Sequence, residues 1–241
     1  MSSFLKITQG SFHQGHVKFG LTRGRQCTCC PLFSITFSVV KNPGYWCQGD
    51  IDYIVENGDK IFKKLNPTLY LDLDSLPREI EIMNRSISVE FLGLKSALIS
   101  SKSRPGSIMD RDVDPRSNGF LFVVNEKCIS VTWNKRFYFL FDSHSRNSLG
   151  KTSADGTATL TKFSSKKNLE CFILSNFLRE TDEKVQFELQ YIAVSKENLE
   201  KISNDYRTYV KKSKGDTPEA KEKARQRRAM PEAKERDRVR K

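Results

Sequence analysis

Five apolar segments between residues 119 and 194 restrict the fold of this chain more than any other feature. They are FLFVV at 120–124, CISVTW at 128–133, RFYFLFDSH at 136–144, TATLTKF at 157–163 and KVQFELQYIAV at 184–194. Apolar residues that alternate with polar ones, or that form short continuous runs rich in β-branched and aromatic residues, are typical of β-strands. EIEIM from residue 79 alternates in the same way. The chain therefore contains a cluster of strands.

Other segments have apolar residues at helical spacing. These predict helices at 49–65, after Ser164 or Ser165, and after Ser195, where each serine is the expected N-cap. Strands clustered together and flanked by helices predict an α+β domain, with a central, mostly antiparallel sheet, at residues 1–210. PLFSITFSVV at 31–40 fits a strand and a helix equally well. The segment at 100–119 holds two prolines and few apolar residues, so we expect an exposed loop.

The positive charge of the chain is concentrated at its end. The net charge is +12, and residues 211–241 hold 13 Lys and Arg against 6 Asp and Glu. This segment repeats PEAKEKARQRR as PEAKERDRVRK and has no apolar face to bury. We expect a basic tail at 211–241 that is helical or disordered. Such a tail could bind nucleic acid.

The first residues lack the apolar run of a signal peptide, and no 18-residue apolar stretch follows. We therefore expect an intracellular protein, cytoplasmic or nuclear, that does not contact a membrane. In such a compartment the six cysteines are expected to be reduced, which leaves thiols free for chemistry.

Asp142 and His144 lie two residues apart at the end of an apolar strand. Side chains two positions apart in a strand point to the same face, so the carboxylate can orient the imidazole. This is the base and its orienting partner in a catalytic triad. The alternative is a strand-end Asp and His that hydrogen-bond to loop backbone groups.

RGRQCTCC at 23–30 holds half of the cysteines. Proline is tolerated only in the first turn of a helix, so a helix containing Pro31 would begin at about residues 28–31. Cys27 would then precede the helix, where the helix dipole and the charges of Arg23 and Arg25 favour a thiolate. Cys27 is thus the predicted nucleophile. Four of the other five cysteines are expected to be small buried residues, by default: Cys29, Cys47, Cys128 and Cys171.

A metal-binding alternative uses overlapping residues. His13 and His16 have the spacing of metal ligands, as do Cys27 and Cys30, and together they would supply four donors to zinc. The protein would then be a zinc-binding module with a nucleic-acid-binding tail. That hypothesis leaves the FDSHSRN motif at 141–147 and Gln14 without a role.

Three motifs in order carry a resemblance to a known family: GSFHQGHVKFG…RGRQC, GDIDYIVENGDKIF and FYFLFDSHSRNSLG. Together they resemble the N-terminal deubiquitinating cysteine protease of herpesvirus large tegument proteins. They resemble still more closely the related ubiquitin-protease-like (OTU-like) domains of animal transposable elements. The resemblance spans roughly residues 10–195. It implies a papain-like cysteine protease that needs no cofactor or metal.

The resemblance also implies roles for single residues. Cys27 is the nucleophile, His144 the general base, Asp142 its orienting partner, and Gln14 the oxyanion donor. The implied partner is ubiquitin or a ubiquitin-like modifier, cleaved after its C-terminal glycine. The resemblance further favours a helix at 31–40.

One feature of the sequence departs from that family. CTCCP at 27–31 is not the expected sequence around the nucleophile, which leaves a catalytically inactive, ubiquitin-binding relative as an alternative. The basic C-terminal tail of ubiquitin also calls for acidic groups near the site. The loop at 100–119 offers three: Asp110, Asp112 and Asp114.

Overall fold

The computed structural model describes residues 4–109, 113–178 and 183–215. The chain divides into two units between Glu197 and Asn198. The first unit contains eight strands, three α-helices and two short 3-10 helices among its described residues. In chain order they are β1 (Lys6–Gln9), η1 (Val17–Thr22), α1 (Cys29–Val40), η2 (Pro43–Tyr45), α2 (Gln48–Leu65), β2 (Glu79–Ile82), β3 (Arg85–Ile99), β4 (Gly119–Val124), β5 (Lys127–Trp133), β6 (Tyr138–Arg146), β7 (Thr157–Phe163), α3 (Lys166–Phe177) and β8 (Val185–Val194).

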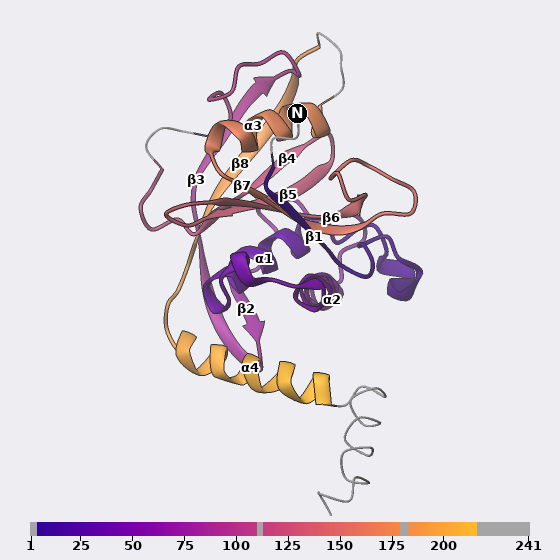
Figure 1. Cartoon of the computed structure of the whole chain (residues 1–241), viewed down its shortest axis with the longest axis vertical. Helices are drawn as coiled ribbons and strands as arrows, with labels where there is room; N and C mark the ends of the chain where they lie inside the picture. The colour runs from indigo at the N-terminus through magenta and orange to yellow at the C-terminus, as the bar shows by residue number, and fades with distance from the viewer. Residues whose placement is uncertain (1–3, 110–112, 179–182, 216–241) are drawn as a thin grey trace, which may run out of the picture. The chain divides into compact units, whose positions relative to one another are not determined.

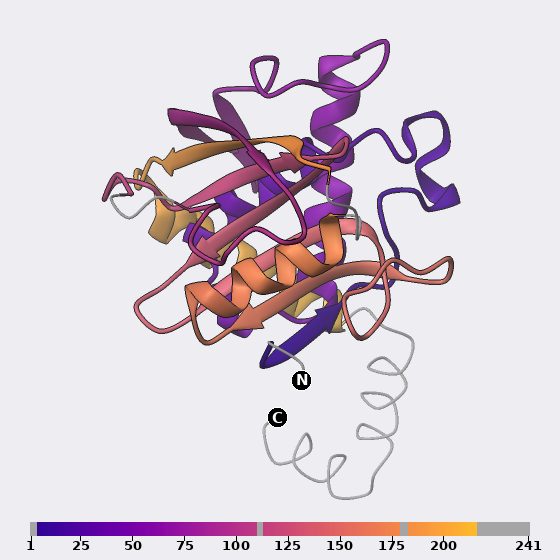
Figure 2. The ribbon, with the colours of Figure 1, turned by 90° about the horizontal axis from the view of Figure 1, so that it is seen from above.

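The strands form one antiparallel sheet in the order β1-β7-β6-β5-β4-β8-β3-β2. α1 and α2 lie on one face of the sheet and α3 lies on the other (Figure 1). Seen from above, α3 lies over the sheet (Figure 2). Because both faces are covered, three consecutive residues of β6 are buried: Phe139, Leu140 and Phe141. The predicted α+β class and the central antiparallel sheet are confirmed.

The ambiguous segment at 31–40 is part of helix α1. Ten of the twelve residues of α1 are buried, because the helix packs against both the sheet and the neighbouring helix α2. Ser34 Oγ lies 2.5 Å from Ser130 Oγ on β5, which joins the helix to the sheet. A helix that is apolar on every side has no polar stripe, so its periodicity cannot identify it.

Gly58 allows α2 to pack closely against α1. A Cβ atom at this position would lie 2.5 Å from Cys30 Sγ and 2.6 Å from Cys30 Cα. No side chain fits there, so the backbone of α2 passes directly over the start of α1. The helix predicted at 49–65 is α2, which is continuous from Gln48 to Leu65.

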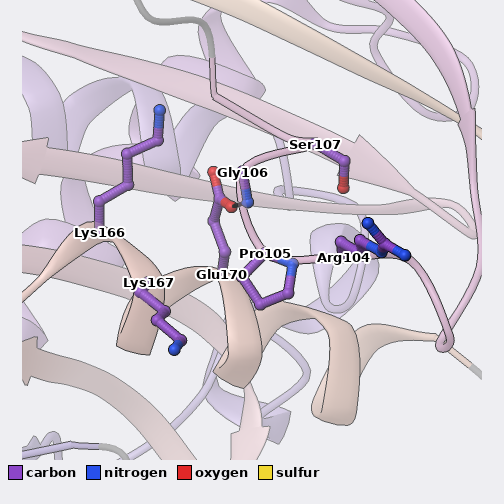
Figure 3. Close-up of a pocket in the computed structure, with 7 residues that line it drawn as sticks. All are labelled: Arg104, Pro105, Gly106, Ser107, Lys166, Lys167 and Glu170. Carbon is purple, nitrogen blue, oxygen red and sulfur yellow. Dashed lines mark hydrogen bonds between the residues drawn. The ribbon is translucent and has the colours of Figure 1, made fainter.

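The predicted exposed loop is partly buried. Residues 100–118 contain no helix or strand among their described positions, but Ile108 and Met109 reach the core between the sheet and α3. The buried carboxylate of Glu170 on α3 accepts a hydrogen bond from the amide of Gly106 (Figure 3). It also accepts one from the amide of Met109. The loop is therefore attached to α3.

The second unit begins with α4 (Leu199–Gly215). The predicted cap at Ser195 is wrong, because its Oγ accepts the amide of Glu197 in a turn before the helix. Asn198 instead accepts the amide of Ile202 in the first turn. Most of the predicted tail at 211–241 lies outside the described residues. Among the described helices, none is both long and apolar enough to cross a membrane.

Gly58→Ala should lower the free energy of unfolding in chemical denaturation by about 1–3 kcal/mol, because the new methyl group overpacks the contact with Cys30. Helix propensity alone predicts the opposite sign, a gain of about 1 kcal/mol. Gly49→Ala on the same helix is the control, since a Cβ there meets nothing within 4 Å. A Gly58→Ala protein at least as stable as wild type would contradict the close contact.

Candidate active site

The last residues of β6 bring a carboxylate and an imidazole together. Asp142 Oδ1 lies 2.6 Å from His144 Nδ1 and also accepts the backbone amide of His144 at 2.9 Å. Asp142 is 1% exposed and His144 is half-buried. Because an ionised carboxylate can only accept, the imidazole carries its proton on Nδ1. Its Nε2 is then free to accept a proton.

Asp142 remains ionised although it is buried. Burial opposes its negative charge, but the charges of His144 and Arg146 and the hydrogen bonds from His144 outweigh burial. They hold the pKa of the Asp142 carboxyl well below its usual range. A carboxyl with a lowered pKa stabilises the fold above its unfolded pKa of about 4. That stability is lost as the pH falls through the folded-state pKa.

Arg146 is the partner of Asp142 that the sequence analysis missed. Its Nε donates to Asp142 Oδ2 at 2.5 Å, and its Nη1 donates to Thr152 Oγ1 at 2.8 Å. The guanidinium lies 4.5 Å from the centre of the Phe177 ring, and Arg146 is only 1% exposed. A signal was present, because Arg146 follows Asp142 by four residues and alternation places both on one strand face.

Gln14 is held against the same strand from a distant part of the chain. Its backbone N–H donates to the backbone oxygen of Ser143 at 2.9 Å, and its backbone oxygen accepts the backbone N–H of Gly24 at 3.0 Å. Ser143 Oγ donates to Gln14 Oε1 at 2.9 Å. The predicted oxyanion donor therefore lies beside the Asp142–His144 pair.

The segment from residue 11 to residue 26, which carries Gln14, is fastened to α2. Three carboxylates spaced four and three residues apart on α2 bind side chains of this segment. The pairs are Asp52 with Ser11, Glu56 with Lys18, and Asp59 with Thr22 and Gln26. Gln26, which Asp59 binds, directly precedes Cys27 in the chain. Helix α2 thus positions the backbone that leads into the predicted nucleophile.

Cys27 lies two residues before α1, as the position of Pro31 predicts, but its thiol is buried and only 6% exposed. Burial raises its pKa above the usual value of 9.0. Backbone N–H groups of Cys128, Cys27 and Thr28 oppose this rise in pKa, and the nearby charge of Asp142 adds to it. The resting thiol is therefore neutral, which differs from the expected thiolate. No hydrogen bond joins Cys27 to His144 among the described residues.

The other cysteines differ in their exposure. Cys29 and Cys128 are fully buried, as expected, and so is Cys30. Burial raises the pKa values of all three thiols, that of Cys29 to about 12. The expectation of burial is wrong for Cys47, which is exposed, and for Cys171, which is half-buried. Thiols with raised pKa values are poor nucleophiles at neutral pH.

The four proposed zinc ligands do not assemble. His13 Nδ1 accepts the amide of Gly15, and His16 Nδ1 accepts the amide of Lys18 as the cap of η1. Cys30 Sγ faces Val55 O. In the described part of the chain, no group of three or more His, Cys, Asp or Glu residues could hold a metal ion. The zinc-module alternative is wrong for these residues.

His13 instead lies close to the candidate site. Burial lowers its pKa, and the charges of His16 and His144 lower it further.

The loop at 100–119 was expected to supply acidic groups for the basic tail of ubiquitin, and its described part offers less acidic charge than expected. Asp114 pairs with Arg116, which also pairs with Glu90 on β3. Asp110 and Asp112 lie outside the described residues.

Comparisons with known proteins support the family resemblance and the fold. The sequence pattern of the herpesvirus tegument protein, N-terminal conserved region, matches residues 9–198. The fold is similar to that of the ubiquitin-specific protease encoded by a murine cytomegalovirus tegument protein, solved in complex with a ubiquitin-based suicide substrate. The TM-score is 0.63 at 13% identity, and the match covers 79% of this chain and 87% of the other. No curated protein matches significantly in sequence. The fold is papain-like, as the resemblance implied.

Arg146→Met should lower the free energy of unfolding at pH 7 by about 3–5 kcal/mol, because it leaves Asp142 buried with one fewer cation. The loss should shrink as the pH falls and Asp142 becomes protonated. Arg116→Met, which removes a solvent-exposed ion pair, is the control and should change stability little. Urea unfolding at several pH values measures both. Equal, small losses in the two variants would contradict the ion pair.

Alkylation of Cys27 should accelerate about tenfold per pH unit up to at least pH 9, because only the thiolate reacts and its pKa is raised. Iodoacetamide labelling, followed at the peptide that contains Cys27, measures this rate. A Cys47→Ser background removes the exposed thiol. A rate that is already constant above pH 6 would show a resting thiolate instead.

Proposed function

The chain belongs to the family of the herpesvirus tegument protein N-terminal conserved region, and on that premise we propose that it is a cysteine protease. In this proposal it hydrolyses the peptide or isopeptide bond after the C-terminal glycine of ubiquitin or a ubiquitin-like modifier. The observation that carries the proposal is the tripeptide Asp142-Ser143-His144. Its Asp142 orients His144, while its Ser143 binds Gln14.

The proposed reaction begins with proton transfer. Because the resting thiol of Cys27 is neutral, His144 Nε2 takes its proton as the sulfur attacks the scissile carbonyl. Asp142 accepts the Nδ1 proton of His144 in a hydrogen bond and stabilises the imidazolium that forms. The carbonyl oxygen becomes an oxyanion, which Gln14 Nε2 and nearby backbone N–H groups stabilise.

The tetrahedral intermediate then collapses. The carbon–nitrogen bond breaks, His144 returns the proton to the leaving amine, and a thioester to Cys27 remains. His144 next removes a proton from water, which attacks the thioester through a second oxyanion at Gln14. Collapse of this intermediate returns the proton to the thiol and releases the modifier with a free carboxylate.

Cys27 and His144 must come within hydrogen-bonding distance for this chemistry. In the resting site Asp142 is close enough to both residues to affect Cys27 electrostatically and His144 by hydrogen bonding. In this proposal the two side chains come together when substrate binds, as catalytic hydrogen bonds often tighten in the substrate complex.

The substrate class is supported by the fold comparison. The similar viral protease was solved with a ubiquitin-based suicide substrate, and the similarity extends over most of both chains. We infer that ubiquitin or a close relative occupies the equivalent face of this chain. The nucleic-acid partner expected of the basic tail depends on residues that mostly lie outside the described ranges.

Ubiquitin that carries a thiol-reactive electrophile at its C-terminus should form a covalent adduct with the wild-type protein. The adduct should be lost in Cys27→Ala and retained in Cys47→Ser, which removes an exposed thiol. With an amide-linked ubiquitin substrate, His144→Ala should reduce kcat by about 10³-fold or more, and Asp142→Asn by less. Intact mass and fluorogenic hydrolysis measure these effects.

The outcomes separate the alternatives. No adduct with ubiquitin, in a folded and reduced sample, would exclude ubiquitin as the substrate. Ubiquitin binding without an adduct would identify this protein as a catalytically inactive, ubiquitin-binding relative. Hydrolysis that survives in Cys27→Ala would overturn the assignment of the nucleophile.

A further inference from the structure

Ser143 is a buried hydroxyl between the two residues that form the candidate base. It is 0% exposed, and Gln14, its partner, is 4% exposed. Two hydrogen bonds of 2.9 Å join these residues, one from Gln14 N to Ser143 O and one from Ser143 Oγ to Gln14 Oε1. The backbone bond sets the position of Gln14. The hydroxyl bond sets the rotation of its amide.

The rotation of this amide matters because its two ends have opposite chemistry. Oε1 only accepts hydrogen bonds, whereas Nε2 only donates them. With Oε1 turned to Ser143, Nε2 points away from it. Among the residues that the structure describes, Nε2 makes no hydrogen bond. It is therefore available to an incoming oxyanion. The opposite rotation would present an oxygen lone pair to the developing negative charge.

The neighbours of Ser143 favour the observed rotation. The hydroxyl has one proton, which it donates to Gln14 Oε1 at 2.9 Å, and the Cys30 thiol lies near it in the described part of the chain. Burial raises the pKa of Cys30 well above 9.0, so this thiol is neutral and a weak acceptor. The Cys30 thiol donates its own proton toward Val55 O. The amide oxygen is thus the stronger acceptor for Ser143.

We propose that Ser143 is a positioning residue that holds the Gln14 amide with Nε2 facing the reacting carbonyl. This inference rests on the proposed function, and it assigns to Ser143 no contact with the substrate. Asp142 and Ser143, which are adjacent on β6, then each orient one catalytic side chain. The first orients the base, and the second orients the oxyanion donor.

A double-mutant cycle tests the proposal. Gln14→Ala should lower kcat by about 10²–10³-fold, the usual cost of removing an oxyanion donor. Ser143→Ala should lower kcat roughly five- to tenfold, the cost of one hydrogen bond, with KM nearly unchanged. The double variant should be no slower than Gln14→Ala alone, because Ser143 acts only through Gln14. Additive losses would overturn the proposal.

Ser130→Ala is the matched control. Ser130 is also a buried serine, on the neighbouring strand β5, and its hydroxyl is hydrogen-bonded to Ser34. Its loss should reduce stability without changing kcat. If Ser143→Ala fails to fold, Ser143→Cys keeps nearly the same volume with a weaker donor, and the same cycle applies.

A second measurement does not depend on activity. The side-chain amide signals of Gln14 in a ¹⁵N-labelled sample can be assigned by their absence in Gln14→Ala. Ser143→Ala should shift or broaden these signals, because the amide becomes free to rotate, whereas Ser130→Ala should not. Unchanged signals would overturn the proposal. Altered signals in a protein without hydrolytic activity would keep the contact while rejecting the proposed function.

Discussion

The buried negative charge of Asp142 is the interaction on which the rest of the site depends. A carboxylate without water is stable only if cations and donors surround it, and here His144 and Arg146 bind its two oxygens. Arg146 is in turn held by Thr152 and by the ring of Phe177 on α3. The orientation of the candidate base is thereby linked to the packing of α3 on the far face of the sheet.

Helix α2 has a comparable role for the other half of the site. Its residues Asp52, Glu56 and Asp59 fasten the segment that carries Gln14 and leads into Cys27, while Gly58 lets the helix approach Cys30. Strand β6 then receives Gln14 through Ser143. The oxyanion donor and the nucleophile come from one segment, and the base comes from another that lies more than a hundred residues further along the chain. Contacts with one helix and one strand bring those segments together.

The sequence predicted those features that depend on local pattern. Alternation and short continuous apolar runs identified strands β4 to β8, and the spacing of Asp142 and His144 on one strand was sufficient to pair them. The sequence did not predict the features that depend on tertiary contacts. The pattern of β3 is broken by a register shift between Phe91 and Leu94, and that of α1 is hidden because it is buried on all sides. Ser143 carried no signal of its own, since only the fold brings Gln14 to it. The neutral state of Cys27 follows from burial, which no local pattern records.

The central claim is that Asp142 holds His144 in the one tautomer that leaves Nε2 free to accept a proton. ¹⁵N NMR of the His144 ring at a pH where the imidazole is neutral tests it directly, with the signals assigned by their absence in His144→Ala. The account predicts a protonated Nδ1 and an unprotonated Nε2. A proton on Nε2, or a rapid exchange between both tautomers as in free histidine, would contradict it.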